Sequence, residues 1–555
     1  MEHRVEKAQL YHALHGFPAR LASEPAQLGG EIEKALHRHV GIGGGVLGQV
    51  ADQALRLERR FDDVVAADRD PAGGGRHESR DHAHGGRLSR AVRAEEAEHF
   101  AALDGERNVV YRPPRAEGLR QPVDFYHAKR GAELSPNYNT QSLRIIVPDV
   151  IVIGAGAAGL AAADELAHAG RSVLVVEARS RIGGRCWTCR FPGLSAPVEL
   201  GAEFIHGRPP VTLALLQRAG SAALDSARTQ RFVTDGRLRA IDAFAEARKA
   251  MRNTAVLKVK DWSFATFLAR KRGLSRRTRS FARMMVEGFD AADPARASAR
   301  AIVEEWCASP QLGAQFRPLG GYSALLDSLA GSDVRLQSVV REIRWERGSV
   351  EVRGECLGTR FRHRAPQAIV SLPLGVLQSD AVRFIPALKE KRPALKKLAS
   401  GPVVKIALRF RAAFWEEEHP GVAFFHSPAA AFPTFWTPLP TRVPFLIGWA
   451  GGPKAVRLAG LKRDEVVRCA LHSLRSIFGR QGELVAIHAH DWQADPYARG
   501  AYSYVTVGGE GARQALQAPL GDTLYFAGEA TDTQGEAGTV AGALQSGLLA
   551  ARQLI

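Results

Sequence analysis

Cysteine is scarce in this chain, with five in 555 residues. This scarcity excludes a small fold held together by disulfides and suits a reducing compartment. No run of about 18 uncharged apolar residues occurs. The most apolar stretch, 150–170, contains Asp164, Glu165 and His168, which argues against a transmembrane span. The chain also opens on charged residues and not on a secretory signal. We therefore expect a cytoplasmic protein without a membrane span.

The positive charge is concentrated in one part of the chain. The formal net charge is +17 at pH 7. Residues 1–145 contain 21 Lys or Arg and 21 Asp or Glu, so the whole excess lies in residues 146–555. The densest basic run extends from Arg270 to Arg283. We interpret it as a solvated face, since no nucleic-acid-binding motif accompanies it, and no nucleic-acid partner is expected.

Residues 1–145 differ in composition from the rest of the chain. They hold 10 of the 18 histidines, no cysteine and no tryptophan, and glycine clusters interrupt their apolar periodicity. The composition predicts a poorly structured N-terminal extension. One hypothesis is that this segment comes from an over-extended start site and that the native protein begins near Ile145–Val147. The scattered histidines lack the spacing of a metal site, and no metal is predicted.

The clearest structural pattern begins at Asp149. Asp149–Ile153 is a continuous apolar run typical of a buried parallel strand. An alanine-rich helix, Ala157–His168, and a second such strand, Ser172–Glu177, follow it. Together they predict a βαβ unit.

A GxGxxG turn, residues 154–159, joins the first strand to the helix. Gly154 permits the tight turn, Gly156 lets a pyrophosphate approach the backbone, and Gly159 lets helix and strand pack closely. Glu177 ends the second strand, where a carboxylate accepts hydrogen bonds from ribose hydroxyls. The unit therefore predicts a dinucleotide site, with the pyrophosphate at the positive end of the helix dipole.

Further elements are expected along the chain. Periodicity predicts helices near 211–219, 240–256, 262–270, 321–330 and 463–477. It predicts strands near 334–345, 349–353, 367–372 and 402–409. The last unit is a strand at 523–527 followed by a helix from about 538 to 554. This order predicts an α/β fold in which a mixed sheet with helices is inserted into a Rossmann-like domain.

Further motifs follow the glycine turn in a fixed order. They are Arg179–Arg185 (RSRIGGR), Val198–Gly207 (VELGAEFIHG), Leu336–Ile343, Ser371–Leu377, Trp492–Tyr504 and Tyr525–Gly547. Together with the glycine turn, this series resembles the flavin-dependent amine oxidases over about 147–555, with monoamine and polyamine oxidases as the nearest types.

The resemblance implies a discontinuous FAD-binding domain and an inserted substrate domain. The FAD-binding parts are 146–215, 321–375 and 496–555. The substrate-domain parts are 216–320, which is mainly helical, and 376–495. The mitochondrial monoamine oxidases attach FAD through a cysteine at the position that is Ala501 here, so non-covalent FAD is expected.

The resemblance also assigns residues to the cofactor. The expected FAD-binding residues are Gly154, Gly156, Ala158, Gly159, Glu177, Ala178, Arg179, Gly184, Arg185, Gly201, Ala202, Val340, Gly528, Glu529, Thr539 and Val540. Glu529 is expected to accept a hydrogen bond from a cofactor hydroxyl. Thr539 and Val540 begin the last helix, whose free N–H groups would face the flavin edge that becomes negative on reduction.

The reactive side is expected to include one lysine and several polar groups. Counting back from the strand 403–410, the family's flavin-facing lysine falls on Lys391, with a neighbouring lysine as the alternative. The expected substrate-binding residues are Glu203, His206, Tyr502 and Glu536. Two carboxylates and a histidine suit a cationic amine or a polyamine, with Glu203 and Glu536 binding a distal ammonium.

The implied reaction is FAD-dependent oxidation of an amine. Hydride passes from the amine α-carbon to flavin N5, the imine hydrolyses, and O2 reoxidises the flavin to give hydrogen peroxide. The expected partners are a small amine and O2. Two alternatives remain: a flavin-dependent desaturase or porphyrinogen-type oxidase, and a non-catalytic flavin-fold binding protein.

Overall fold

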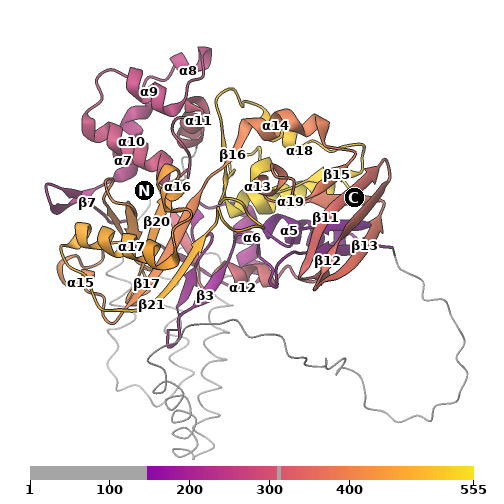
Figure 1. Cartoon of the computed structure of the whole chain (residues 1–555), viewed down its shortest axis with the longest axis horizontal. Coiled ribbons are helices and arrows are strands. Elements are labelled where there is room, and N and C mark those ends of the chain that lie inside the picture. The colour runs from indigo at the N-terminus through magenta and orange to yellow at the C-terminus, as the bar shows by residue number, and fades with distance from the viewer. Residues whose placement is uncertain (1–146, 195, 309–313) are drawn as a thin grey trace, which may run out of the picture. The chain divides into compact units, whose positions relative to one another are not determined.

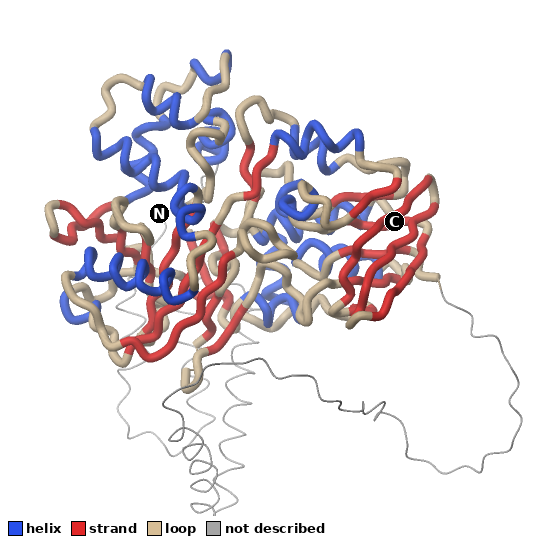
Figure 2. Tube along the Cα trace, viewed as in Figure 1, coloured by secondary structure: helices blue, strands red, loops and turns tan. Residues whose placement is uncertain are grey.

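The computed structural model describes residues 147–194, 196–308 and 314–555 (Figure 1). The predicted N-terminal extension, 1–145, and the start-site hypothesis lie outside the described residues. The described chain contains both helices and strands, often in runs of one kind (Figure 2). Among the described helices, none is long and apolar enough to cross a membrane.

A five-stranded parallel sheet lies at the centre of the cofactor-binding part. Its order is β10 (Asp333–Arg335), β2 (Val173–Val176), β1 (Val150–Ile153), β14 (Gln367–Val370) and β23 (Leu524–Phe526). The strands come from three segments that are far apart in the sequence. The parallel sheet is therefore assembled from a discontinuous stretch of chain, as the strand pattern predicts.

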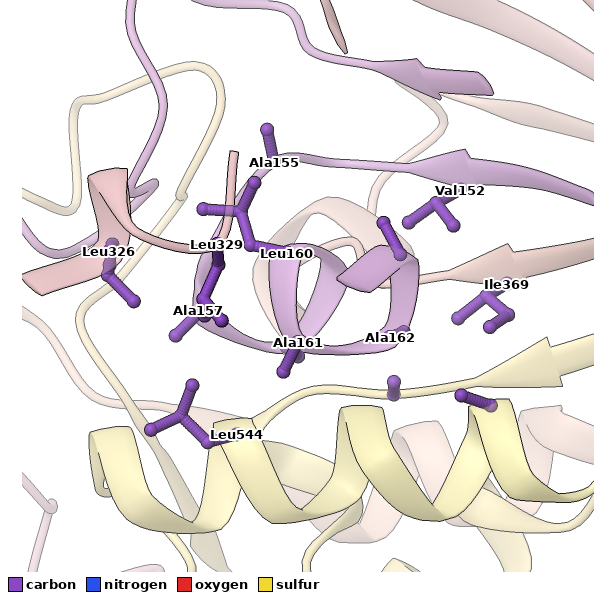
Figure 3. Packing of buried hydrophobic residues seen from close by; sticks show 14 of the residues in the cluster. Val152, Ala155, Ala157, Leu160, Ala161, Ala162, Leu326, Leu329, Ile369 and Leu544 are labelled. Atoms are coloured by element: carbon purple, nitrogen blue, oxygen red, sulfur yellow. The ribbon is translucent and has the colours of Figure 1, made fainter. Parts of the chain in front are cut away.

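Two helices cover one face of this sheet. α5 (Ala157–His168) packs against α19 (Val540–Arg552), and both bury alanine and leucine residues (Figure 3). The backbones of the two helices are in close contact, because a Cβ added to Gly547 would lie 2.1 Å from the backbone oxygen of Ala158. Small residues therefore bring the first and the last helix of the described domain together.

A four-stranded sheet borders the parallel sheet. Its order is β13 (Thr359–Ala365), β12 (Ser349–Cys356), β11 (Ser338–Glu346) and β15 (Arg383–Ile385). The prediction of one strand over 334–345 is wrong. Gln337 has a positive φ of 55°, and this turn separates β10 of the parallel sheet from β11.

The largest sheet has seven strands and belongs to the substrate-binding part. Its order is β21 (Leu484–Asp491), β17 (Val403–Phe410), β20 (Phe445–Gly451), β19 (Thr434–Trp436), β18 (Phe424–His426), β7 (Gln230–Thr234) and β8 (Arg237–Ile241). The prediction of one helix over 240–256 is wrong, because β8 continues to Ile241 and pairs with β7. The side chain of Asp242 then accepts from the Ala245 N–H at 2.8 Å and starts a short helix.

Five helices form one group with a shared core (Figure 1). They are α7 (Ala243–Arg248), α8 (Val256–Val259), α9 (Phe264–Arg270), α10 (Arg276–Gly288) and α11 (Ala299–Ala308). The basic run predicted to be a solvated face continues into the first part of α10, and this helix buries Phe281 and Met285.

The remaining elements connect these layers. They are β3 (Thr188–Arg190), β4 (Pro197–Glu199), β5 (Ile205–His206), α6 (Pro210–Arg218), β6 (Ala223–Asp225), η1 (Lys249–Met251), β9 (Gln315–Pro318), α12 (Tyr322–Asp327), α13 (Leu374–Leu377), η2 (Lys389–Lys391), α14 (Arg392–Lys397), β16 (Leu398–Ser400), α15 (Trp415–Glu418), α16 (Pro453–Leu458), α17 (Arg463–Phe478), β22 (Ser503–Val505), α18 (Ala512–Gln517) and η3 (Glu529–Thr531).

Candidate functional site

One large cavity, of about 1120 Å³, lies between the parallel sheet, the seven-stranded sheet and the helical group. The ends of β1, β2 and β14 border it, as does the start of α19. Ligand sites in open α/β sheets lie at the carboxyl ends of the strands, which is where this cavity opens. Its volume exceeds that of a typical small-molecule pocket.

The glycine turn meets the cavity at the start of α5. Gly154 has a φ of 106°, and a Cβ on Gly159 would lie only 1.9 Å from the Gly154 oxygen, so both positions require glycine. Gly156 differs, because a Cβ there would come no closer than 4.0 Å to the chain. α5 has no side-chain cap at Gly156. Its first-turn N–H groups are therefore available to an anion such as a pyrophosphate.

Glu177 closes this end of the cavity. Its Oε2 accepts from the Ala155 N–H at 2.8 Å, and its Oε1 accepts from the Arg179 N–H at 2.8 Å. Burial raises the pKa of Glu177, although these hydrogen bonds oppose the shift. Arg179 forms an ion pair with Asp495 at 2.8 Å. The chain thus holds both residues in place at the cavity wall.

Arg185 and Glu529 form an ion pair at 2.9 Å across the middle of the cavity wall. Glu529 also accepts from the N–H of Ser503 at 3.1 Å and from its hydroxyl at 2.7 Å. Burial opposes ionisation of Glu529, but Arg185 and Arg513 outweigh it and hold its pKa below the ordinary value. Glu529 was expected to bind a cofactor hydroxyl. In the structure its two carboxylate oxygens accept hydrogen bonds from Arg185 and Ser503, and the contact with Arg185 orients that side chain.

The start of α19 forms the opposite wall. Thr539 caps this helix, because its hydroxyl accepts from the Gly542 N–H at 3.0 Å. Thr539 and Val540 line the cavity together with Gly528. The dipole of α19 therefore presents its positive end to whatever occupies this part of the cavity.

The expected cofactor residues gather at this one cavity. All of them line it except Gly159, which acts through helix–strand packing. The uncapped start of α5, the room at Gly156 and the positive end of α19 fit a dinucleotide that carries a reducible ring. Ala501 also lines the cavity, so this position offers no sulfur for a covalent bond.

The two buried lysines lie in different places. Lys391 is buried outside the cavity lining, and its Nζ donates to the backbone oxygens of Ala515 and Ala518. Burial lowers its pKa to about 8. Lys405, in β17, lines the cavity and donates from Nζ to the Gly201 oxygen at 3.0 Å. The structure therefore does not bring Lys391 to the cavity. The lysine that lines it is Lys405, which the count from the strand did not select.

Glu203 is buried in the cavity wall among donors. Its Oε2 accepts from Lys405 Nζ at 2.7 Å, and its Oε1 accepts from Arg317 Nε at 3.0 Å and Trp436 Nε1 at 2.9 Å. Burial opposes its ionisation, but the two cations outweigh burial and lower its pKa. We call Glu203, Lys405, Arg317 and Trp436 the Glu203 cluster. Its carboxylate is already neutralised, so the expectation that Glu203 binds a distal ammonium does not fit this geometry.

The other expected substrate residues also line the cavity. Burial lowers the pKa of His206 to about 4, which keeps it neutral at pH 7. Tyr502 donates its hydroxyl hydrogen to the Phe289 oxygen. Glu536 is half-buried just before α19, and burial and the nearby Asp532 raise its pKa.

Asp290 and Glu305 are functional candidates that the sequence analysis missed. Both line the cavity, and neither belongs to a recognisable motif. Burial raises the pKa of each, and the charge of Glu305 adds to the effect on Asp290. Asp290 stands between Phe289 and Ala291, and a charged residue between apolar neighbours was the one signal available in the sequence.

A family model described as "Flavin containing amine oxidoreductase" matches residues 157–555. Human lysine-specific histone demethylase 2 is 30% identical over 443 residues, which cover 73% of this chain and 53% of that protein. Polyamine oxidase 2 of Arabidopsis thaliana is 30% identical over 438 residues, which cover 73% of this chain and 87% of that protein. The chain thus spans about half the length of the demethylases that it matches.

Solved structures share the fold. Putrescine oxidase bound to putrescine has a TM-score of 0.63 and 21% sequence identity, covering 74% of this chain and 99% of that one. Cyclohexylamine oxidase from Brevibacterium oxydans IH-35A has a TM-score of 0.62 and 24% identity, covering 73% and 98%. The predicted fold class is therefore confirmed.

Proposed function

The chain belongs to the family of flavin-containing amine oxidoreductases, and on this premise we propose that it oxidises small cationic amines with FAD and O2. The family also bears out the expectation of FAD as cofactor. The observation that carries the proposal is the meeting of the glycine turn and the start of α19 at one cavity.

The cofactor site would be held at two ends. The first turn of α5 and Glu177 would hold the pyrophosphate and the ribose. The positive end of α19 would face the flavin ring. FAD held there would supply the two-electron oxidation of the amine at its α-carbon, with O2 as the final electron acceptor and hydrogen peroxide as the product.

The chain's own residues prepare the amine. The reacting nitrogen must be neutral, since a protonated amine lacks the lone pair that assists loss of hydride. Burial in this cavity wall and the positive charges of Lys405 and Arg317 disfavour the protonated form of an amine placed beside them. His206 is neutral at pH 7, so it adds no positive charge that would repel a cationic substrate.

We assign the role of the family lysine to Lys405. Among the residues that the structure describes, it is the lysine of the cavity lining. Its contacts with Gly201 and Glu203 fix its Nζ at the wall. Such a fixed charged donor would orient a water or an oxygen species near the reacting atoms.

A second candidate function is oxidation of a methylated lysine side chain. The 30% identity to human lysine-specific histone demethylase 2 favours it. The polyamine oxidases are covered over a larger share of their length, 87% for the Arabidopsis protein against 53% for the demethylase. We therefore place small amines first.

The test is a peroxide assay on the purified, FAD-loaded protein. The panel contains monoamines, diamines, polyamines and N-methyl-lysine peptides, with catalase as the control for peroxide. We expect peroxide with diamines or polyamines. Lys405→Met should lower kcat by about 100-fold, the usual effect of removing one preorganised donor. A flavin-loaded protein that oxidises no amine would overturn the proposal, and oxidation of the peptides alone would favour the second candidate.

A further inference from the structure

Asp495 is a buried acid that joins two parts of the chain that border the cavity. It follows β21, an edge strand of the seven-stranded sheet, and it is 6% exposed. Its two carboxylate oxygens accept from the two terminal nitrogens of Arg179, at 2.8 and 2.9 Å. Arg179 opens the RSRIGGR motif after β2. This bidentate ion pair therefore connects the end of the seven-stranded sheet to the turn after β2.

Further donors fix the orientation of Asp495. The N–H of Tyr497 donates to Oδ1 at 2.9 Å, and Nε2 of His490 lies 3.0 Å from Oδ2. Burial opposes ionisation of Asp495, but the hydrogen bonds from His490 and Arg179 outweigh burial and hold its pKa well below the ordinary value. Asp495 is therefore a fixed negative charge at neutral pH, and Nε2 of His490 donates to it.

Arg179 uses its side chain and its backbone for different partners. Both terminal nitrogens bond Asp495, and the guanidinium also lies 5.5 Å from the ring centroid of Tyr497 and 6.0 Å from that of Trp492. The backbone N–H of Arg179 donates to Glu177 Oε1 at 2.8 Å. Anchoring the side chain of Arg179 therefore restrains the backbone group that holds Glu177.

Glu177 is held from two sides. Its Oε2 accepts from the N–H of Ala155, in the glycine turn, at 2.8 Å. Its Oε1 accepts from Arg179, whose side chain is anchored from the seven-stranded sheet. A carboxylate at the end of the second strand of such a unit accepts hydrogen bonds from the ribose hydroxyls of a dinucleotide. The orientation of Glu177, and with it the hold on the ribose, thus depends on both contacts.

His490 extends this connection to the reactive side of the cavity. In the antiparallel pairing of β17 with β21, His490 lies directly opposite Lys405. Residues paired in this way lie next to each other on the same face of a sheet. The strand pair that carries Lys405 is therefore also the strand pair that supports Asp495.

We propose that Asp495 is a positioning residue for FAD. Through Arg179 it holds Glu177 in the orientation that accepts the ribose hydroxyls. Through His490 it ties this end of the cofactor site to the strands that carry Lys405. The inference rests on the placement of the ribose at Glu177, which belongs to the proposed function.

The test measures the affinity of the apoprotein for FAD from the change in flavin fluorescence on binding. Asp495→Asn keeps the size of the side chain and removes its charge. Asp333→Asn is the matched control, because Asp333 forms the same kind of two-bond pair with Arg335. That pair also borders Glu177, whose N–H donates to the Arg335 oxygen at 2.9 Å, but its side chains are about half exposed.

We expect the Kd for FAD to rise by about tenfold or more in Asp495→Asn, as for the loss of one charge-assisted hydrogen bond. Asp333→Asn should change the Kd by less than about twofold, since an exposed ion pair contributes little. A Kd that is unchanged in Asp495→Asn, or that rises equally in both variants, would overturn the proposal.

A positioning role also predicts how Asp495 combines with Glu177. Glu177→Gln alone should raise the Kd by about tenfold or more. If Asp495 acts through Glu177, adding Asp495→Asn to Glu177→Gln should change the Kd by less than about a further twofold. A general loss of structure would instead make the two effects multiply, to about hundredfold. That outcome, or no effect of Glu177→Gln, would count against the proposal.

Asp495→Asn leaves the cation of Arg179 without its partner, so its folding is first checked by circular dichroism. If the variant does not fold, the double variant with Arg179→Met, which leaves no unpaired charge at this place, replaces it in both comparisons with the same expected results. No amine is present in these titrations. A protein that oxidises no amine, and so contradicts the proposed function, therefore still tests the role of Asp495.

Discussion

The Glu203 cluster and the Asp290–Glu305 pair are two acidic groups that line one cavity, and they differ in their partners. Glu203 has Lys405 and Arg317 against it, so it is ionised and neutralised. Asp290 has a tryptophan N–H, another acid and an unpartnered oxygen. The difference teaches that burial alone does not define a binding carboxylate.

The largest expected effect comes from breaking the Glu203 cluster. Glu203→Gln should lower the free energy of unfolding by about 3–5 kcal/mol, because it leaves Lys405 and Arg317 buried without a counter-charge. The measurement is urea unfolding at pH 7. The double variant with Lys405→Met should recover part of the loss, and a double variant as unstable as the sum of the singles would contradict the pairing.

The loss of unfolding free energy in Glu203→Gln should also depend on pH. The pKa of Glu203 is lower in the folded protein than in the unfolded chain, so its contribution to stability is present above the unfolded value. It disappears as the pH falls through the folded pKa. The difference between wild type and Glu203→Gln should therefore shrink below about pH 4. A difference that stays constant down to pH 3 would argue that Glu203 acts through packing and not through charge.

Asp290→Asn should raise the free energy of unfolding at pH 7, whereas Glu203→Gln lowers it. The pKa of Asp290 is raised on folding, so the wild type loses stability as the pH rises above the unfolded value. We expect the variant to be more stable at pH 7, by about 1.4 kcal/mol for each pH unit between the folded and unfolded pKa. The gain should vanish near pH 3, and thermal unfolding at both pH values measures it. If Asp290→Asn is less stable than the wild type at pH 7, the predicted difference between Asp290 and Glu203 is wrong.

The smallest effect is expected at Lys391. Its Nζ bonds the Ala515 and Ala518 oxygens outside the cavity, so Lys391→Met should leave kcat within about twofold of wild type. Lys405→Met, the matched change inside the cavity, should lower it strongly. Amine kinetics on the two variants measure this. A large loss in Lys391→Met with normal FAD content would return the catalytic role to that residue.

The sequence predicts the cofactor half of the site better than the substrate half. The glycine turn, α5 and α19 follow from local patterns, since glycine spacing and alanine-rich periodicity specify a strand–turn–helix unit within a few residues. Lys405 lies within the buried strand β17. A lysine inside this apolar run was a signal for a functional residue, but counting back from the start of the strand led to Lys391 instead. A charge at such a position is seldom buried without a partner.

The Asp290–Glu305 pair could not be predicted from local pattern. Asp290 lies in the loop after α10, and Glu305 lies on α11 after a gap of 14 residues. Only the packing of the helical group brings them to the same cavity wall. The seven-stranded sheet was missed in part for a similar reason: its strands β18 and β19 have three residues each and carry no readable alternation.

The central claim is that this cavity lets an amine reduce bound FAD. The most direct measurement is the visible absorbance of the FAD-loaded protein after mixing with 1,4-diaminobutane without oxygen. The account predicts that the absorbance of oxidised flavin disappears and returns, with peroxide, when air is admitted. An absorbance that stays constant with diamines, monoamines and methyl-lysine peptides alike would contradict it.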